Sequence, residues 1–123
     1  MKIIIDTHIF LWLLNEPEKV SQKYMKHLEN TENTIYLSSI SVAELMIKKS
    51  IEKLEFDFDI LSVTAQMGLE VLPFEGMDAI GLGALPLHHK DPFDRMIISQ
   101  ALSKNYHIIS DDGKFGLYDC KLI

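Results

Sequence analysis

The sequence predicts a single α/β domain over residues 1–123, with a mainly parallel central sheet of four to five strands flanked by helices. Short apolar runs alternate with segments of helical spacing, and such alternation forms βαβ units with right-handed crossovers. The first run, Lys2–Ile5, is apolar without interruption, as expected of a strand buried on both faces of a parallel sheet. A chain of 123 residues can bury a core without disulfides or metals as staples.

The composition is that of an ordinary globular protein, with 47% hydrophobic and 24% charged residues. The longest apolar run, Ile9–Leu14, is far short of the roughly 20 residues that span a membrane. The N-terminus begins with a strand pattern, so we expect no signal peptide. Cys120 is the only cysteine, which excludes an internal disulfide and favours a cytoplasmic location.

The formal net charge is −6, and the twelve basic residues include a single arginine, Arg95. This balance is poorly suited to gripping nucleic acid by counterion release. It remains compatible with a nucleic-acid substrate if divalent cations bridge acidic side chains to phosphate. An acidic surface also suits a basic protein partner, so charge alone does not choose between these functions.

Turn and breaker residues divide the chain into regular elements. After Lys2–Ile5, strands are expected at Thr34–Leu37, Glu70–Phe74 and Tyr106–Ile109, with a short edge strand at Lys121–Ile123. Helices are expected at Ile9–Leu14, Glu18–Glu29, Ser41 towards Lys53, Asp57 or Asp59 to Met67, Asp78–Leu85 and Pro92–Lys104. No repeat, linker or low-complexity segment interrupts this pattern, which indicates one compact domain.

Two helix starts carry recognisable capping signals. Asp91 precedes Pro92, which suits the first helical position, so Asp91 is predicted to be the N-cap of the last long helix. Asp94 then falls at the third helical position, over the positive end of the helix. Ser41 and Glu44 have the spacing of a capping box, with Ile40 and Leu45 placed to form a hydrophobic staple.

Four carboxylates, Asp6, Glu44, Asp94 and Asp112, stand at predicted strand or helix ends. Ligands of an open parallel sheet bind beyond the carboxyl ends of its strands, so this topology can gather the four acids. Each has a purely structural alternative: a capping-box acid for Glu44, a helix-end charge for Asp94, and a turn residue for Asp112 and its neighbour Asp111. Asp6 closes a buried apolar run and needs a partner or an ion. Crowded carboxylates indicate a cation, and their oxygens suit Mg²⁺ or Mn²⁺.

The ordered set of motifs resembles the PIN domain over essentially the whole chain. The motifs are Ile3-Ile4-Ile5-Asp6-Thr7, Ser41-x-x-Glu44, His89-x-Asp91-Pro92-Phe93-Asp94-Arg95 and Ser110-x-Asp112-x-x-Phe115. The Asp-Pro-Phe-Asp-Arg segment, with the small size of the chain, resembles the VapC-type toxins of bacterial toxin–antitoxin pairs. Each motif alone is weak evidence, whereas the order and spacing of all four are specific.

The resemblance implies that Asp6, Glu44 and Asp94 hold the metal and that Asp112 matches a fourth, more variable acidic position. Thr7 matches a small hydroxyl residue beside the first acid. Ser110 stands where threonine is commoner, a departure that keeps the hydroxyl. The implied activity is that of an endoribonuclease toxin dependent on Mg²⁺ or Mn²⁺, which hydrolyses RNA by a metal-activated water. The implied partners are an RNA substrate, a cognate antitoxin protein and a second copy of the chain in a homodimer.

The histidines and Trp12 are expected to have structural roles rather than to take part in chemistry. The five histidines do not form a predicted ligand set; His8 is expected to be a loop or packing residue, and His88 and His89 to lie in a solvated loop. Trp12 is expected in the core or in a dimer interface. Arg95 has two open roles, pairing with a neighbouring acid or contacting phosphate.

Two rival functions were weighed against the nuclease. A haloacid-dehalogenase-like phosphatase also carries an Asp-Thr pair after its first strand, but its chemistry needs a second acid two residues after the nucleophile, where this chain has His8. The other rival is a PIN-like binding module without catalysis. All four acids are present, which favours the enzyme.

Overall fold

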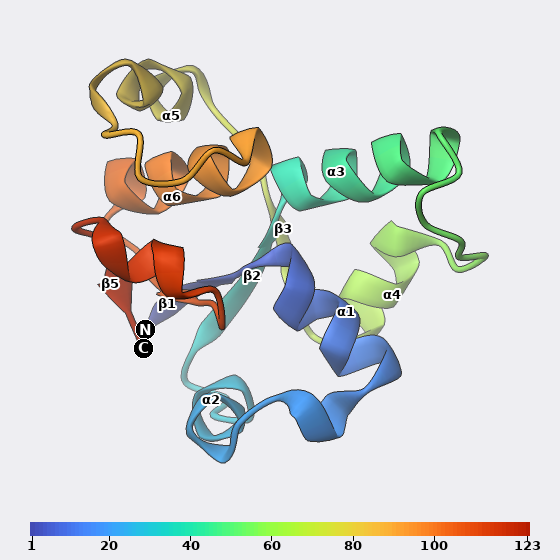
Figure 1. Ribbon diagram of the computed structural model, residues 1–123. Helices are drawn as coiled ribbons and strands as arrows, with labels where there is room; N and C mark the ends of the chain where they lie inside the picture. Colours follow the sequence, from blue (N-terminus) through green and yellow to red (C-terminus); the bar gives the residue numbers. More distant parts are fainter.

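The computed structural model describes residues 1–123 and contains one five-stranded sheet with the strand order β3-β2-β1-β4-β5 (Figure 1). Every neighbouring pair is parallel, which confirms the predicted fold class. The strands are β1 (Lys2–Ile5), β2 (Thr34–Ser38), β3 (Glu70–Leu72), β4 (His107–Ile109) and β5 (Lys121–Leu122). All strands therefore end at the same edge of the sheet, which is where a parallel sheet places its ligands.

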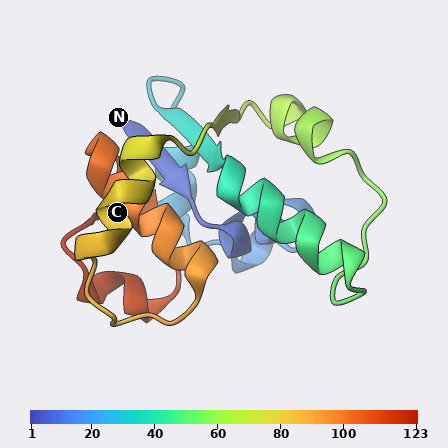
Figure 2. The same ribbon diagram turned by 90° about the horizontal axis from the view of Figure 1, so that it is seen from above.

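Helices cover both faces of the sheet. Figure 1 shows α5 and α6 on one side and α1 and α2 on the other, and α3 contacts α6 (Figure 2). The α-helices are α1 (Thr7–Asn15), α2 (Gln22–Leu28), α3 (Ser39–Ser50), α4 (Ile60–Gln66), α5 (Gly76–Ile80) and α6 (Pro92–Lys104). Three 3₁₀ turns complete the fold: η1 (Pro17–Lys19), η2 (Gly81–Ala84) and η3 (Gly113–Leu117). None of these helices has both the length and the hydrophobicity needed to cross a lipid bilayer.

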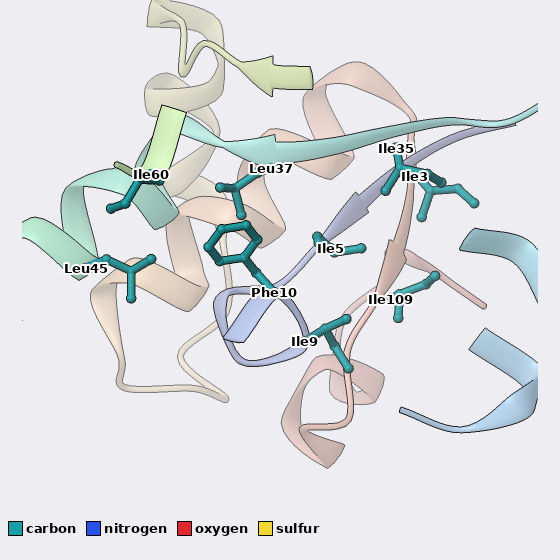
Figure 3. Packing of buried hydrophobic residues seen from close by; sticks show 9 residues of the cluster. All are labelled: Ile3, Ile5, Ile9, Phe10, Ile35, Leu37, Leu45, Ile60 and Ile109. Atoms are coloured by element: carbon teal, nitrogen blue, oxygen red, sulfur yellow. The ribbon is translucent and has the colours of Figure 1, made fainter. Parts of the chain in front are cut away.

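Strand β1 lies in the middle of the sheet, and its side chains alternate between two hydrophobic clusters, one on each face. Ile3 and Ile5 belong to the cluster that includes Phe10 of α1 and Leu45 of α3 (Figure 3). Ile4 belongs to the opposite cluster, packed with residues of α6 and η3. All three isoleucines are fully buried. Burial on both faces explains why the β1 run is continuously apolar rather than alternating.

The predicted capping box at Ser41 and Glu44 is wrong. Strand β2 passes directly into α3, whose N-cap is Ser38, with its Oγ accepting a hydrogen bond of 3.1 Å from the Ile40 N–H. Ser41 and Glu44 consequently lie inside the helix, and both side chains are buried. The predicted staple fails for the same reason, since Ile40 and Leu45 pack into different clusters.

Other boundaries differ from the prediction for local reasons. The expected helix over residues 18–29 is divided, because Val20 adopts an extended conformation and Ser21 begins α2 as its N-cap. Asp59, and not Asp57, caps α4. The third strand ends at Leu72, before Pro73, which has no N–H to donate to a neighbouring strand. The expected helix over residues 78–85 begins at Gly76 as α5 and tightens into the turn η2.

The last long helix follows the prediction at both ends. Asp91 is the N-cap of α6, and its Oδ1 accepts hydrogen bonds of 2.8 Å from the Phe93 N–H and 3.3 Å from the Asp94 N–H. Asn105 ends the helix in the left-handed conformation with φ of 59°. Side-chain capping at one end and a residue that tolerates positive φ at the other define this helix from local sequence alone.

We expect Ile4→Ala to lower the free energy of unfolding by about 2–5 kcal/mol, because it leaves a cavity between β1 and α6. Ile51→Ala is the matched control, since Ile51 is 55% exposed, and we expect a change within about 0.5 kcal/mol. Urea unfolding followed by circular dichroism measures both values. Equal stability of the two variants would show that the central strand contributes no more than a surface position.

Candidate active site

All four predicted acids lie on one cleft at the carboxyl edge of the sheet. The cleft has a volume of about 720 Å³. Its acidic lining consists of Asp6, Glu44, Asp91, Asp94, Asp111 and Asp112. Two lysines, Lys48 and Lys53, also line it, together with Thr7, His8, Leu11, Trp12, Leu45 and Leu54. Acids from widely separated parts of the chain are thus brought to a single concave site.

Asp6 stands at the end of the central strand and is held at both carboxylate oxygens. Oδ1 accepts a hydrogen bond of 2.8 Å from the Ile9 N–H, which makes Asp6 the N-cap of α1. Oδ2 accepts a hydrogen bond of 2.5 Å from the Ser110 hydroxyl. The side chain is buried, and this loss of solvation raises the pKa of Asp6 despite both hydrogen bonds. The carboxylate is therefore oriented but short of positive charge.

Glu44 is connected to the first strand through Thr7. The Thr7 Oγ1 lies 2.8 Å from both the Glu44 Oε1 and the Ser41 Oγ. Because a carboxylate can only accept, Thr7 donates its single proton to Glu44 and accepts from Ser41. The Lys48 Nζ lies 2.7 Å from the Glu44 Oε2, and this hydrogen bond raises the pKa of Lys48. One turn of α3 thus supplies both the acid and its basic partner.

Asp94 and Asp112 are joined by His89. The His89 Nε2 lies 2.9 Å from the Asp94 Oδ2 and 3.0 Å from the Asp112 Oδ2. The predicted solvated position of His89 is wrong, because the residue is only 7% exposed. His8 lies on α1, is exposed and lines the cleft, where its ring makes a T-shaped contact with Trp12 at a centroid distance of 4.9 Å.

The two acids joined by His89 have opposite electrostatic surroundings. Burial and the charge of Asp91 raise the pKa of Asp94 to about 7, although His89 acts in the lowering direction. Burial also acts to raise the pKa of Asp112, but hydrogen bonds from the Lys114 N–H and from His89 outweigh it and hold that pKa below its usual value. Asp94 is therefore the acid of this pair with the greater unmet need for a cation.

The loop before α6 is held by Arg95 and Tyr118. Arg95 pairs with no acid; its guanidinium donates to the carbonyl oxygens of Leu85 and Pro86, at 3.3 and 2.9 Å. The Tyr118 hydroxyl donates to Pro86 and accepts from the N–H of His89, both at 2.8 Å. These contacts give Arg95 a role in shaping the loop that carries His89.

Sequence reasoning missed two contributors to the site, His89 and Lys48. It singled out Thr7 beside the first acid, but not the hydrogen bonds that connect Thr7 to Ser41 and Glu44. Lys48 follows Glu44 by four residues on a helix, a spacing that signals an ion pair. The position of His89 carried no such signal, because its partners Asp94 and Asp112 come from α6 and from the turn after β4. The contact across the sheet edge exists only in the folded chain.

The residues of the cleft fit a divalent cation. Their ligand atoms are carboxylate oxygens, which suit Mg²⁺ and Mn²⁺. The raised pKa values of Asp6 and Asp94 show that the protein's own donors leave part of the negative charge uncompensated. Among Asp6, Glu44, Asp94 and Asp112, only Glu44 forms an ion pair with a lysine or arginine, and that partner is Lys48.

Sequence comparison identifies the fold family. Residues 3–119 match the family model of the PIN domain. The chain belongs to the PIN domain family. No curated protein sequence matches this PIN domain significantly.

Solved structures share the fold at low sequence identity. This PIN domain is similar to a chain of VapBC2 from Rickettsia felis bound to promoter DNA, with a TM-score of 0.75, 22% identity, and coverage of 100% and 98% of the two chains. A chain of DNA-bound VapBC from Salmonella typhimurium gives a TM-score of 0.73 at 21% identity, with coverage of 100% and 97%. The PIN domain endonuclease Utp24 gives 0.54 at 22% identity, covering 94% of this chain and 74% of its own.

The raised pKa of Asp94 predicts a stability that depends on pH. The folded state holds the Asp94 proton up to about pH 7, whereas the unfolded chain releases it near 3.8. Stability of the metal-free PIN domain should therefore fall as the pH rises between these values, and level off above them. Allowing for solvent screening, we expect a loss on the order of 1 kcal/mol.

Asp94→Asn removes this titration, so its stability should change less over the same pH range. Urea unfolding in chelator, at several pH values, measures both proteins. The expectation fails if wild type gains stability with rising pH, or if both proteins have the same pH profile.

Proposed function

We propose that this PIN domain is an endoribonuclease toxin that uses Mg²⁺ or Mn²⁺ to hydrolyse RNA phosphodiester bonds and is neutralised by a cognate antitoxin. The observation that carries the proposal is the convergence of Asp6, Glu44, Asp94 and Asp112 on one cleft with too little positive charge of its own. Membership of the PIN family supports nuclease activity. Its fold neighbours include VapBC complexes and a PIN domain endonuclease.

In this proposal Asp6, Glu44 and Asp94 hold one or two divalent ions, and Asp112 supports them. The ions, when bound, lower the pKa of a water molecule and offset the charge of the phosphate. The protein's contribution is to keep the acids in place. Ser110 and the Ile9 N–H orient Asp6, while Thr7 and Lys48 orient Glu44. This rigid support reduces the reorganisation needed when substrate arrives.

Lys48 and Lys53 are the basic side chains available to the substrate in the cleft. We assign them to the RNA phosphates beside the scissile bond, since a chain of net charge −6 has little other means of attracting a polyanion there. The hydrolysis requires no covalent protein nucleophile. The Thr7 hydroxyl, the nearest alternative, already donates to Glu44.

The antitoxin is expected to present basic side chains to the acidic cleft, which would compete with both metal and RNA. The similarity of the fold to VapBC chains supports a partner of this kind. We further propose that the chain forms homodimers and acts in the cytoplasm.

The test is cleavage of total RNA and tRNA by purified, partner-free protein in Mg²⁺ or Mn²⁺ and in excess chelator. We expect discrete fragments from wild type, and a loss of at least about 100-fold for Asp6→Asn, because a misplaced metal removes several kcal/mol of transition-state stabilisation. Asp119→Asn is the matched control, since Asp119 is exposed and lies outside the cleft.

Cleavage that survives Asp6→Asn or chelation would mean that another site or a contaminant acts. If wild type neither cleaves RNA nor binds metal in calorimetry, the chain is a PIN domain that serves only as a binding module. Thermal unfolding of Asp6→Asn separates loss of the site from loss of the fold.

The role of the cleft lysines yields a separate expectation. Lys48→Met should weaken binding of single-stranded RNA in chelator for all sequences, and should reduce the slope of log affinity against log salt by about 1. Lys23→Met is the control, because Lys23 is exposed on α2 away from the cleft. Fluorescence anisotropy over a salt series measures both. An unchanged slope for Lys48→Met would show that Lys48 does not contact the RNA phosphates.

A further inference from the structure

The position of His89 is compatible with two chemical roles, that of a metal ligand and that of a hydrogen-bond donor to the neighbouring acids. Its Nε2 lies within 3.0 Å of one carboxylate oxygen from Asp94 and one from Asp112. One nitrogen and two carboxylates at such spacing form a potential metal-ligand group. The nitrogen can instead carry a proton that it donates to Asp112 in a hydrogen bond, with Asp94 at ion-pair distance beside it. The state of the other ring nitrogen distinguishes the two roles.

The other nitrogen of His89, Nδ1, faces a hydrogen-bond donor. The Asp91 N–H points to it at 3.2 Å. A ring nitrogen that accepts a hydrogen bond carries no proton, and a neutral imidazole has only one N–H, so this proton lies on Nε2. Histidines that bind metal show the opposite pattern, with the nitrogen not bound to metal donating its N–H to an acceptor. The surroundings of Nδ1 therefore favour donation, and not metal binding, at Nε2.

The orientation of the ring is also held from both sides. The Tyr118 hydroxyl accepts the backbone N–H of His88 at 3.0 Å and that of His89 at 2.8 Å. The edge of the His89 ring packs against Phe115 at a centroid distance of 6.1 Å. A half-turn of the ring would put carbon atoms in place of both nitrogens and abandon all three polar contacts. The loop thus presents one defined tautomer to the acids.

The two acids are left in different states by this arrangement. The second oxygen of Asp112, Oδ1, accepts a hydrogen bond of 2.9 Å from the Lys114 N–H. Neither carboxylate oxygen of Asp94 accepts a hydrogen bond; Oδ2 only lies 2.9 Å from the His89 Nε2. Asp94 is thereby left open to a cation, whereas Asp112 accepts a hydrogen bond at both oxygens.

We propose that His89 is a positioning residue whose Nε2–H donates to Asp112 while its ring lies beside the Asp94 carboxylate, and that it is not a metal ligand. The proposal deepens, and rests on, the proposed metal-dependent function. His89 aligns the two acids without occupying the cation's coordination positions. The metal would be held by oxygen ligands alone, which agrees with use of Mg²⁺ as well as Mn²⁺.

The tautomer can be observed directly in the full-length protein. Long-range ¹H–¹⁵N spectra of ¹⁵N-labelled wild type, with and without Mg²⁺ or Zn²⁺, report which ring nitrogen of His89 carries the proton; comparison with His89→Gln identifies its signals. We expect protonation at Nε2 in all three conditions. Protonation at Nδ1, or loss of the Nε2 proton when either metal binds, would overturn the proposal.

Two substitutions separate the roles by metal affinity. The amide nitrogen of glutamine can take the place of Nε2, whereas that of asparagine reaches only the position of Nδ1. We expect His89→Gln to bind Mn²⁺ within about three-fold of wild type and His89→Asn to bind at least about ten-fold more weakly, as for loss of a residue that supports metal ligands. Isothermal calorimetry measures both, with thermal unfolding as the check on folding.

A folded His89→Gln variant that binds Mn²⁺ ten-fold or more weakly than wild type would overturn the proposal. This conclusion does not depend on whether the His89→Asn variant folds. The outcome is also separate from that of the proposed function. Wild type that binds Mn²⁺ but cuts no RNA would overturn the nuclease, while the spectra and the glutamine variant would still decide the role of His89.

Discussion

The burial of a carboxylate at the end of the central strand is the constraint on which the rest of this structure depends. Asp6 follows three fully buried isoleucines and is itself only 3% exposed, so its charge must be met mainly by local groups. The fold meets it with the first turn of α1 and with Ser110 at the end of β4. The contact with Ser110 joins the ends of the neighbouring strands β1 and β4 at the edge where the cleft opens. The two contacts do not offset the burial of the carboxylate completely, so the pKa of Asp6 stays above its usual value.

The supports of the acidic cleft differ from one carboxylate to the next. Glu44 has a hydroxyl and an ammonium group, Asp112 has a backbone N–H and a histidine, and Asp94 has the histidine alone. The acids therefore share one cavity but differ in support, and the pKa of Asp94 is raised whereas that of Asp112 is lowered. Such a difference suits a centre that must bind a cation firmly at some oxygens while leaving positions for water and phosphate.

Local chemistry made some elements predictable and others not. The start of helix α6 was predicted because its cap and its proline are neighbours in the sequence. The start of α3 was misjudged because Ser38 competes with Ser41 for the role of N-cap, and the direct passage from β2 decides between them. The placement of Glu44 on the cleft was nevertheless anticipated, since a shift of two or three residues at a helix start leaves the acid at the same edge of the sheet.

The α/β class and the parallel sheet could be derived from the sequence alone, because hydrophobic periodicity is a local property, and the order of the strands let the sequence direct Asp6, Glu44, Asp94 and Asp112 to one edge of the sheet. Only the tertiary structure decided how those acids are held. His89 meets Asp112, and Thr7 meets Ser41 and Glu44, across segments far apart in the chain. Such contacts depend on which strands are neighbours and on how each loop is braced. No pattern within a short window of sequence records that information.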